Sequence, residues 1–412
     1  MKISRASLSE FLFRVEWVLV CTYFLLHPTL YNTSLTGLIW KTGFITFSLR
    51  TLLNIKQIKR THTTPLVVII LIILFQCVTS GIWSSLDTVF SVSAFFVFLL
   101  HISNCEKHIV PRKRFDLVFY SSLFLALLFS VYSLTDLVHK VTTNGQVWYT
   151  TYFVFNLDNS NTAGMYLVFV FSILLINYPL RRQKTLLILV LIYLAYMIFR
   201  TNARMAILSC LFIFFAFLLF RTKRLPQWVI NAVVLLPSLF VSFYLGLYRS
   251  GFEDLVILGK NLFSGRQNVY ADYLKHIQTI PQILFGNLEE ITFSNAHNAT
   301  LAIYCSIGAV GVICFYYIVW GQLRKANYNV KHQINTIAIC CIMGIFLQAC
   351  SEATMFLGGF PGVAFISTLF DFAFSAEMHS QEQCRKQKVD DPPHLHRKPL
   401  LPGRLPGTGQ VL

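Results

Sequence analysis

The sequence predicts an all-α protein, a polytopic bundle of about twelve transmembrane helices with one long outer loop. Of the 412 residues, 55% are hydrophobic and only 13% are charged, whereas soluble proteins carry roughly 25% charged residues. Many apolar runs also approach the ~20 residues that a helix needs to cross a bilayer. The polar–apolar alternation of membrane β-barrels is absent, which leaves helices to satisfy the backbone in lipid.

The apolar runs predict twelve spans. In chain order they are 11–31, 35–54, 65–83, 87–104, 115–137, 158–180, 185–200, 204–220, 228–247, 296–322, 335–352 and 356–376. The first run contains Arg14 and Glu16 and is followed by no small-residue cleavage site. We therefore expect a true helix there and no cleavable signal peptide.

The basic residues predict the orientation of these spans. Nearly half of the 34 lysines and arginines gather in alternate loops, after the second, fourth, sixth, eighth and tenth spans, as in Arg181, Arg182 and Lys184. Short cytoplasmic loops carry such an excess, so both termini are expected in the cytoplasm. The net charge of +16 then reflects topology and attraction to anionic membrane lipids, and it requires no nucleic-acid partner.

Two further segments complete the predicted organisation. The loop 248–295 falls on the non-cytoplasmic side, and Phe263, Tyr270, Leu274 and Ile277 recur in it at helical spacing. We expect a partly helical, amphipathic cap on the membrane surface. Residues 1–380 form the predicted membrane domain, and the proline-rich, basic stretch 381–412 is predicted to be a disordered cytoplasmic tail.

A few polar groups meet on the predicted outer face and are candidates for chemistry. Arg204 begins the eighth span, Arg266 lies in the long loop, and His297 lies where that loop re-enters the membrane, at the start of the tenth span. Asn161 lies at the outer start of the sixth span, and Glu352 ends the eleventh. Ionisable groups are costly at this depth and are functional candidates for that reason.

Each of these residues also has a plainer interpretation. Arg204 alone fits an anchor that reaches the lipid headgroups, and Arg266 alone fits a solvated loop residue. His297 and Asn161 fit helix starts, where polar residues cap the backbone. Together, however, two arginines and a histidine suit metal-free transfer from a diphosphate donor. Arginine binds phosphate oxygens bidentately, and histidine can take a proton from an attacking hydroxyl. No histidine or cysteine spacing typical of a metal site occurs, so we expect no metal or cofactor.

The stretch from Leu262 to Val312 resembles the O-antigen ligase and polymerase superfamily of bacterial envelope glycosyltransferases. The matching motifs are Ser264-Gly265-Arg266, Leu284-Phe285-Gly286, His297-Asn298-Ala299-Thr300-Leu301 and the Gly308/Gly311 pair. Upstream, Thr201-Asn202-Ala203-Arg204 is similar to the family's Thr-x-Ser-Arg element. Ala203 replaces the usual serine, and Tyr270 stands where tryptophan is usual. The resemblance covers roughly residues 158–322.

The resemblance implies a GT-C-like integral membrane glycosyltransferase in the bacterial inner membrane. Its donor would be a glycan on undecaprenyl diphosphate, used at the periplasmic face with inversion. By this likeness Arg204 and Arg266 bind the donor diphosphate, and His297 activates the acceptor hydroxyl. Asn161, Tyr270 and Asn298 complete the substrate-binding set that we expect.

The motifs favour a repeat-unit polymerase of O-antigen or capsular polysaccharide, for which a chain-length regulator is the expected partner protein. A ligase that transfers the finished polysaccharide to lipid A-core is the alternative. A transporter or flippase for the same lipid is disfavoured, because mid-span positions other than Lys41 are almost all apolar. A flippase is expected to carry charges in a central cavity.

Overall fold

The computed structural model describes residues 4–26, 34–55, 60–80, 86–107, 110–134, 137–138, 141–143, 146–148, 152–153, 160–220, 223–257, 260–263, 265–288, 296–352 and 359–375. All of them belong to one compact unit, Met1–Ser375. The predicted tail 381–412 lies outside the described residues.

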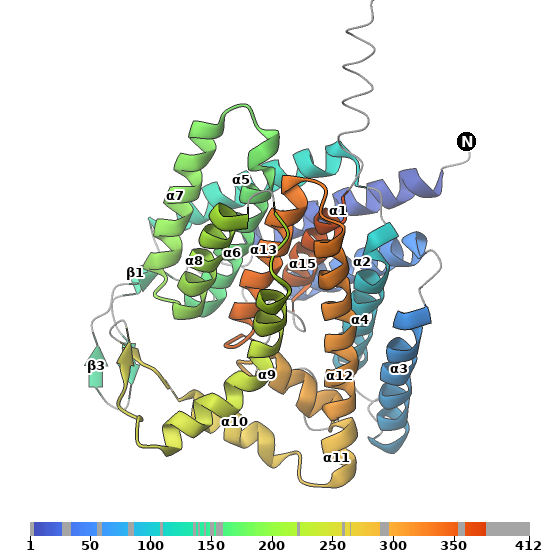
Figure 1. Ribbon diagram of the computed structural model, residues 1–412, viewed down its shortest axis with the longest axis vertical. Helices are drawn as coiled ribbons and strands as arrows, with labels where there is room; N and C mark the ends of the chain where they lie inside the picture. Colours follow the sequence, from blue (N-terminus) through green and yellow to red (C-terminus); the bar gives the residue numbers. More distant parts are fainter. Residues whose placement is uncertain are drawn as a thin grey trace, which may run out of the picture. The chain divides into compact units, whose positions relative to one another are not determined.

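Each of the twelve ranges predicted as spans overlaps one α-helix, and Figure 1 shows these helices gathered into a bundle. They are α1 (Arg5–Leu26), α2 (Ser34–Asn54), α3 (Arg60–Ser80), α4 (Leu86–Asn104), α5 (Arg112–Ser133), α6 (Ser160–Asn177), α7 (Lys184–Arg200), α8 (Arg204–Phe220), α9 (Gln227–Arg249), α12 (Ala299–Tyr328), α13 (Gln333–Gln348) and α15 (Phe360–Ala373). The predicted all-helical bundle is therefore confirmed for the part of the chain that the structure describes.

Five segments of the described chain, in α3, α5, α6, α9 and α12, are long and apolar enough to cross a membrane. Apolar helices α4, α8, α13 and α15 are shorter. Several helices also turn large apolar side chains outward, such as Leu189, Ile192 and Phe199 of α7, each about 60% exposed. Such faces suit contact with lipid, so length and surface together indicate a membrane protein.

The centre of the bundle consists of α6, α13 and α15, whose residues are buried almost all round. Small residues let these helices approach their neighbours closely. A Cβ at Gly164 of α6 would lie 2.8 Å from the Cβ atoms of Ala203 and Ala206 at the start of α8. One at Gly344 of α13 would lie 2.4 Å from Ile213 of α8. This is the small-residue packing common between membrane helices.

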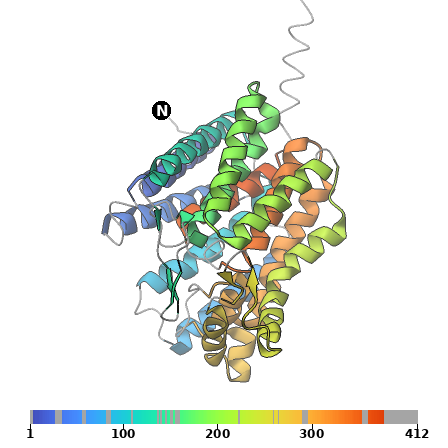
Figure 2. The same ribbon diagram turned by 90° about the vertical axis from the view of Figure 1, so that its left-hand side faces the viewer.

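The long loop after α9 is partly helical, as predicted. It holds the antiparallel pair β5 (Val256–Ile257) and β6 (Lys260–Asn261), then α10 (Arg266–Lys275) and α11 (Ile280–Phe285). Figures 1 and 2 show α10 and α11 lying across one end of the bundle, beside the ends of α9 and α12. Two other short antiparallel pairs, β1 (Leu137–Val138) with β4 (Tyr152–Phe153) and β2 (Val141–Thr143) with β3 (Gln146–Trp148), precede α6.

Two glycines allow α11 to pack closely against α12. Gly286 ends α11 with a φ of 84°, and Gly308 bends α12 with a φ of 70°, both in the left-handed region that favours glycine. A Cβ on Gly286 would lie 2.3 Å from the Ser306 carbonyl, and one on Gly308 would lie 2.3 Å from the Leu284 carbonyl. Gln76 of α3 donates to Ser306 O at 2.9 Å and accepts from Leu288 N at 2.6 Å. The Leu-Phe-Gly motif and Gly308 therefore fix α11 to the bundle.

Candidate functional site

The short link between α7 and α8 orients Arg204 toward the long loop. Thr201 accepts a hydrogen bond from Ala203 N at 3.2 Å, and Asn202 has a φ of 53°. Only three residues separate the two helices, so the chain reverses sharply and α8 begins at Arg204. The Arg204 guanidinium donates to the carbonyls of Asn261 and Leu262 at 3.1 and 3.3 Å. This contact ties the start of α8 to the loop segment that leads into α10.

Arg266 is the first residue of α10, and Gly265 explains why glycine precedes it. Gly265 caps the helix with a φ of 80°, while the space beside it is open, so the backbone conformation rather than crowding requires glycine. The Arg266 Nη2 lies 3.4 Å from Glu352 Oε1. The Glu352 side chain is only 5% exposed, so this ion pair is largely shielded from water.

His297 reaches the same carboxylate from another direction. Its Nδ1 lies 3.9 Å from Glu352 Oε2, and its side chain is 28% exposed. The backbone of His297 has a φ of 51°, which is uncommon for a residue other than glycine and occurs often at functional sites. Within the described ranges, the other non-glycine residue of positive φ is Asn202, two positions before Arg204. One of these two positions is thus a candidate residue itself, and the other lies close to one in the chain.

Tyr270 and Asn298 are buried residues that stabilise this arrangement. The buried Tyr270 hydroxyl donates to the His297 carbonyl at 3.2 Å, and burial raises the pKa of this phenol, which keeps it a donor. Asn298 caps α12 by accepting from Leu301 N at 2.8 Å, and it donates to the carbonyls of Pro237 and Cys350. Because Asn298 is fully buried, its polar atoms stabilise the fold around the neighbouring residue His297.

The charges of the site favour an anion. Arg204 and the Tyr244 hydroxyl both donate to the Leu262 carbonyl, at 3.3 and 3.1 Å, and the Tyr244 ring lies 5.4 Å from the ring of Tyr270 on α10. Arg266 pairs with the Glu352 carboxylate, whereas Arg204 donates to backbone carbonyls. Two guanidinium groups in a partly buried site suit a phosphate group.

Asn161 lies beside this cluster, in a pocket between the ends of three helices. The pocket is lined by Asn161 of α6, by Ala203, Met205 and Ala206 around the start of α8, and by Gln348, Ser351 and Glu352 at the end of α13. Its enclosed space is small, and its empty volume of about 180 Å³ includes solvent at the open mouth. The structure therefore brings together every predicted site residue: the three charged ones, their two buried supports, and Asn161.

Glu352 is the candidate residue whose role the sequence left undecided. Its pairing with Arg266 joins residues 86 positions apart, and no local pattern predicts such a contact. Its place at the predicted end of the eleventh span is the one available signal. Among the described residues, no group of three or more histidine, cysteine, aspartate or glutamate side chains could hold a metal ion.

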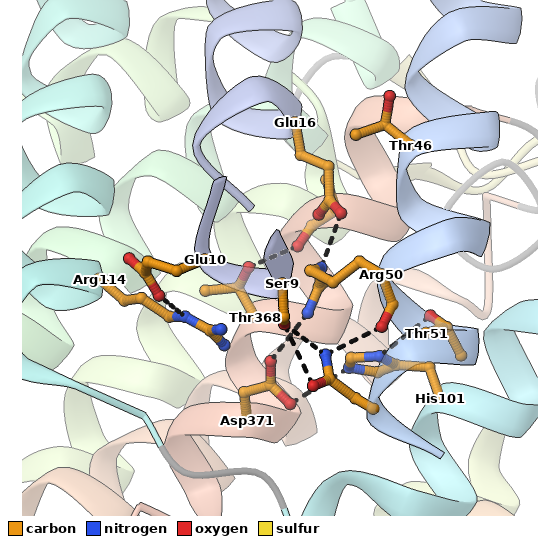
Figure 3. Close-up of polar contacts among 12 residues, drawn as sticks. Ser9, Glu10, Glu16, Thr46, Arg50, Thr51, His101, Arg114, Thr368 and Asp371 are labelled. Carbon is orange, nitrogen blue, oxygen red and sulfur yellow. Dashed lines mark hydrogen bonds and ion pairs between the residues drawn. The ribbon is translucent and has the colours of Figure 1, made fainter. Parts of the chain in front are cut away.

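A second cluster of charges lies within predicted spans, where mid-span positions other than Lys41 were expected to be almost all apolar. Figure 3 shows Arg50 of α2 between Glu16 of α1 and Asp371 of α15, with Arg50 Nε 2.6 Å from Glu16 and Nη1 3.6 Å from Asp371. His101 of α4 lies 3.2 Å from Asp371, and all four side chains are at most 2% exposed. Lys41, the predicted exception, is exposed instead. The expectation failed because a hydropathy run averages one charged residue with many apolar neighbours.

Comparisons with known proteins do not add a family to this site. The chain matches no family model, no curated protein and no solved structure.

Proposed function

We propose that this chain is a metal-independent, inverting membrane glycosyltransferase that polymerises undecaprenyl-diphosphate-linked oligosaccharide repeat units at the periplasmic face. The observation that carries the proposal is the convergence of Arg266 and His297 on Glu352, beside Arg204. The motif resemblance assigns these same three residues to the donor diphosphate and to the acceptor. The proposal includes a GT-C-like bundle with twelve crossings and both termini in the cytoplasm.

The reaction follows from the charges at the site. The acceptor hydroxyl oxygen attacks the anomeric carbon, and the bond from that carbon to the diphosphate oxygen breaks. The hydroxyl proton passes to His297, whose Nδ1 faces Glu352 and whose Nε2 is the accepting nitrogen in this scheme. The leaving diphosphate keeps the bonding electron pair, and its charge is stabilised by Arg204 and Arg266. Direct displacement inverts the configuration at the sugar.

The first test replaces the three residues one at a time with alanine in the purified protein. Arg204→Ala, Arg266→Ala and His297→Ala are each expected to lower elongation of lipid-linked repeat units by at least about 100-fold, in line with the loss of one such group in other enzymes. Protein levels in the membrane should stay normal. Arg249→Ala, an exposed arginine at the end of α9, and His276→Ala, an exposed histidine after α10, are the matched controls. Full activity in any of the three variants removes the role assigned to that residue.

A second function, transport of the same lipid-linked sugar, draws support from the buried charges around Arg50, which a simple enzyme scaffold does not need. Deletion of the gene separates the candidates by gel analysis of surface glycan. Loss of a polymerase leaves lipid A-core with a single repeat unit. Loss of a ligase leaves bare core and long chains on the lipid carrier, and loss of a flippase strands single units on the cytoplasmic side.

A further inference from the structure

The pocket beside Glu352 contains a buried amide that the fold does not use. Gln348 is the last residue of α13, and its side chain lines the pocket while being about 1% exposed as a residue. Neither its amide nitrogen nor its amide oxygen has a hydrogen-bond partner within the described residues. Buried polar side chains are nearly always paired, so an unpaired one beside a pocket points to a missing ligand.

The backbone of Gln348, in contrast, is fully engaged. Its carbonyl accepts from Ser351 N at 2.9 Å and from Glu352 N at 3.0 Å, in the turn that ends α13. This turn holds the Glu352 carboxylate next to Arg266 and fixes the Gln348 side chain at the pocket wall. The amide is therefore held in place by the same turn that orients Glu352, while its own donors and acceptor stay unused.

The chemistry of the wall indicates which part of a substrate would enter. Gln348, Asn161 and Ser351 are neutral groups that both donate and accept hydrogen bonds, and Glu352 accepts them. None of the described residues that line the pocket is an arginine or lysine, so a phosphate would find no counter-charge among them. Sugar hydroxyls, which also donate and accept, match this set. The arginines that suit the diphosphate lie outside the pocket, on α10 and at the first residue of α8.

We propose that this pocket is the hydroxyl-binding part of a saccharide subsite, in which the Gln348 amide binds one hydroxyl of a sugar that lies at the pocket mouth, next to the reacting centre. The proposal rests on the proposed glycosyl transfer and names the part of the substrate that Gln348 recognises. An amide kept unpaired for a ligand costs stability in the empty protein. Replacing Gln348 should therefore lower activity without lowering stability. Replacing a merely structural glutamine would lower both.

The test uses Gln348→Met, which keeps the length of the side chain, and Gln348→Leu in case methionine disturbs packing. Ser209→Ala is the matched control, because Ser209 of α8 is also buried and its hydroxyl lacks a partner among the described residues, but it does not line the pocket. Each full-length variant is purified in detergent. Thermal denaturation is measured alone and with undecaprenyl diphosphate, which carries no sugar. Elongation kinetics are measured on lipid-linked repeat units extracted from a strain that lacks this chain.

Gln348→Met is expected to melt at the same or a higher temperature than the wild type and to respond equally to undecaprenyl diphosphate. Its kcat/KM for elongation should fall about tenfold or more, the effect of losing one hydrogen bond. Wild-type kinetics in both Gln348 variants would overturn the subsite, and so would a parallel loss of stability and activity. A wild-type protein that neither elongates the substrate nor responds to undecaprenyl diphosphate would overturn the proposed function itself and the subsite with it.

Discussion

At the scale of single residues, Glu352 is the group on which the candidate site depends most. Arg266 and His297 come from separate segments, and the Glu352 carboxylate is the atom group that both contact. A carboxylate that faces one ring nitrogen fixes the orientation of an imidazole and stabilises its protonated form. Glu352 is therefore a positioning residue in the proposed reaction, and its charge matters as much as its shape.

Glu352→Gln tests this role because it keeps the shape and removes the charge. We expect turnover to fall about 10- to 100-fold, since misplaced catalytic groups cost about that much. The loss should appear in kcat, with little change in KM for the lipid-linked substrate, because Arg204 and Arg266 remain to bind the diphosphate. Asp272→Asn is the control, for its carboxylate pairs with Lys275 on α10 but is 65% exposed. A change in KM alone would show that Glu352 acts in binding and not in orienting His297.

At the scale of elements, the sequence predicted the helices well and their contacts poorly. Each predicted span lies over a helix, because an apolar run of this length has few other stable conformations in lipid. Arg204, Arg266 and His297 were identified as polar groups on one predicted face and then matched to short motifs, and Gly265 shows why one motif is fixed locally. The ion pairs of Glu352 and of the Arg50 cluster were not predicted, since pairing between distant helices leaves no periodic trace in the sequence. Gly286 and Gly308 were recognised only as motif residues, and the close approach of α11 to α12 at each of them explains why glycine is required.

The cluster around Arg50 joins helices from both ends of the described chain. Arg50 of α2 contacts α1 through Glu16 and α15 through Asp371, and Arg114 of α5 pairs with Glu10 of α1 at 2.7 Å. Figure 3 shows these pairs at one level of the bundle. Removal of one partner from a buried ion pair leaves the other charge without compensation, which is more costly than the pair itself is stabilising.

Arg50→Met is therefore expected to lower the free energy of unfolding by about 3–5 kcal/mol. Thermal denaturation of the purified protein in detergent would record it as a lower melting temperature. Arg14→Met is the matched control, because Arg14 of α1 also faces a carboxylate, Glu10 at 3.8 Å, but its side chain is 54% exposed. An exposed pair of this kind contributes roughly 0–1 kcal/mol. Equal melting temperatures for the two variants would contradict a stabilising role for the buried cluster.

At the scale of the whole molecule, the candidate site and the basic link between α6 and α7 lie at opposite ends of the bundle. In Figure 1 that link is at the upper end of the bundle, whereas α10 and α11 lie across the lower end. Arg181, Arg182 and Lys184 occur in or directly after this link. If basic loops mark the cytoplasm, the site must face the periplasm. The orientation of the protein in the membrane is thus inferred from the fold and the distribution of basic residues. It can be measured independently of any activity.

Lys275→Cys and Lys184→Cys place one reporter at each end. The Lys275 side chain on α10 is 70% exposed, and Lys184 at the start of α7 is also exposed. The nine described native cysteines are buried or half-buried and should react little, and Cys384→Ser removes the tenth, which lies outside the described residues. In spheroplasts, a membrane-impermeant maleimide should label position 275 at once and position 184 only after lysis. Labelling of position 184 in intact spheroplasts would reverse the topology and put the candidate site in the cytoplasm, away from the predicted donor.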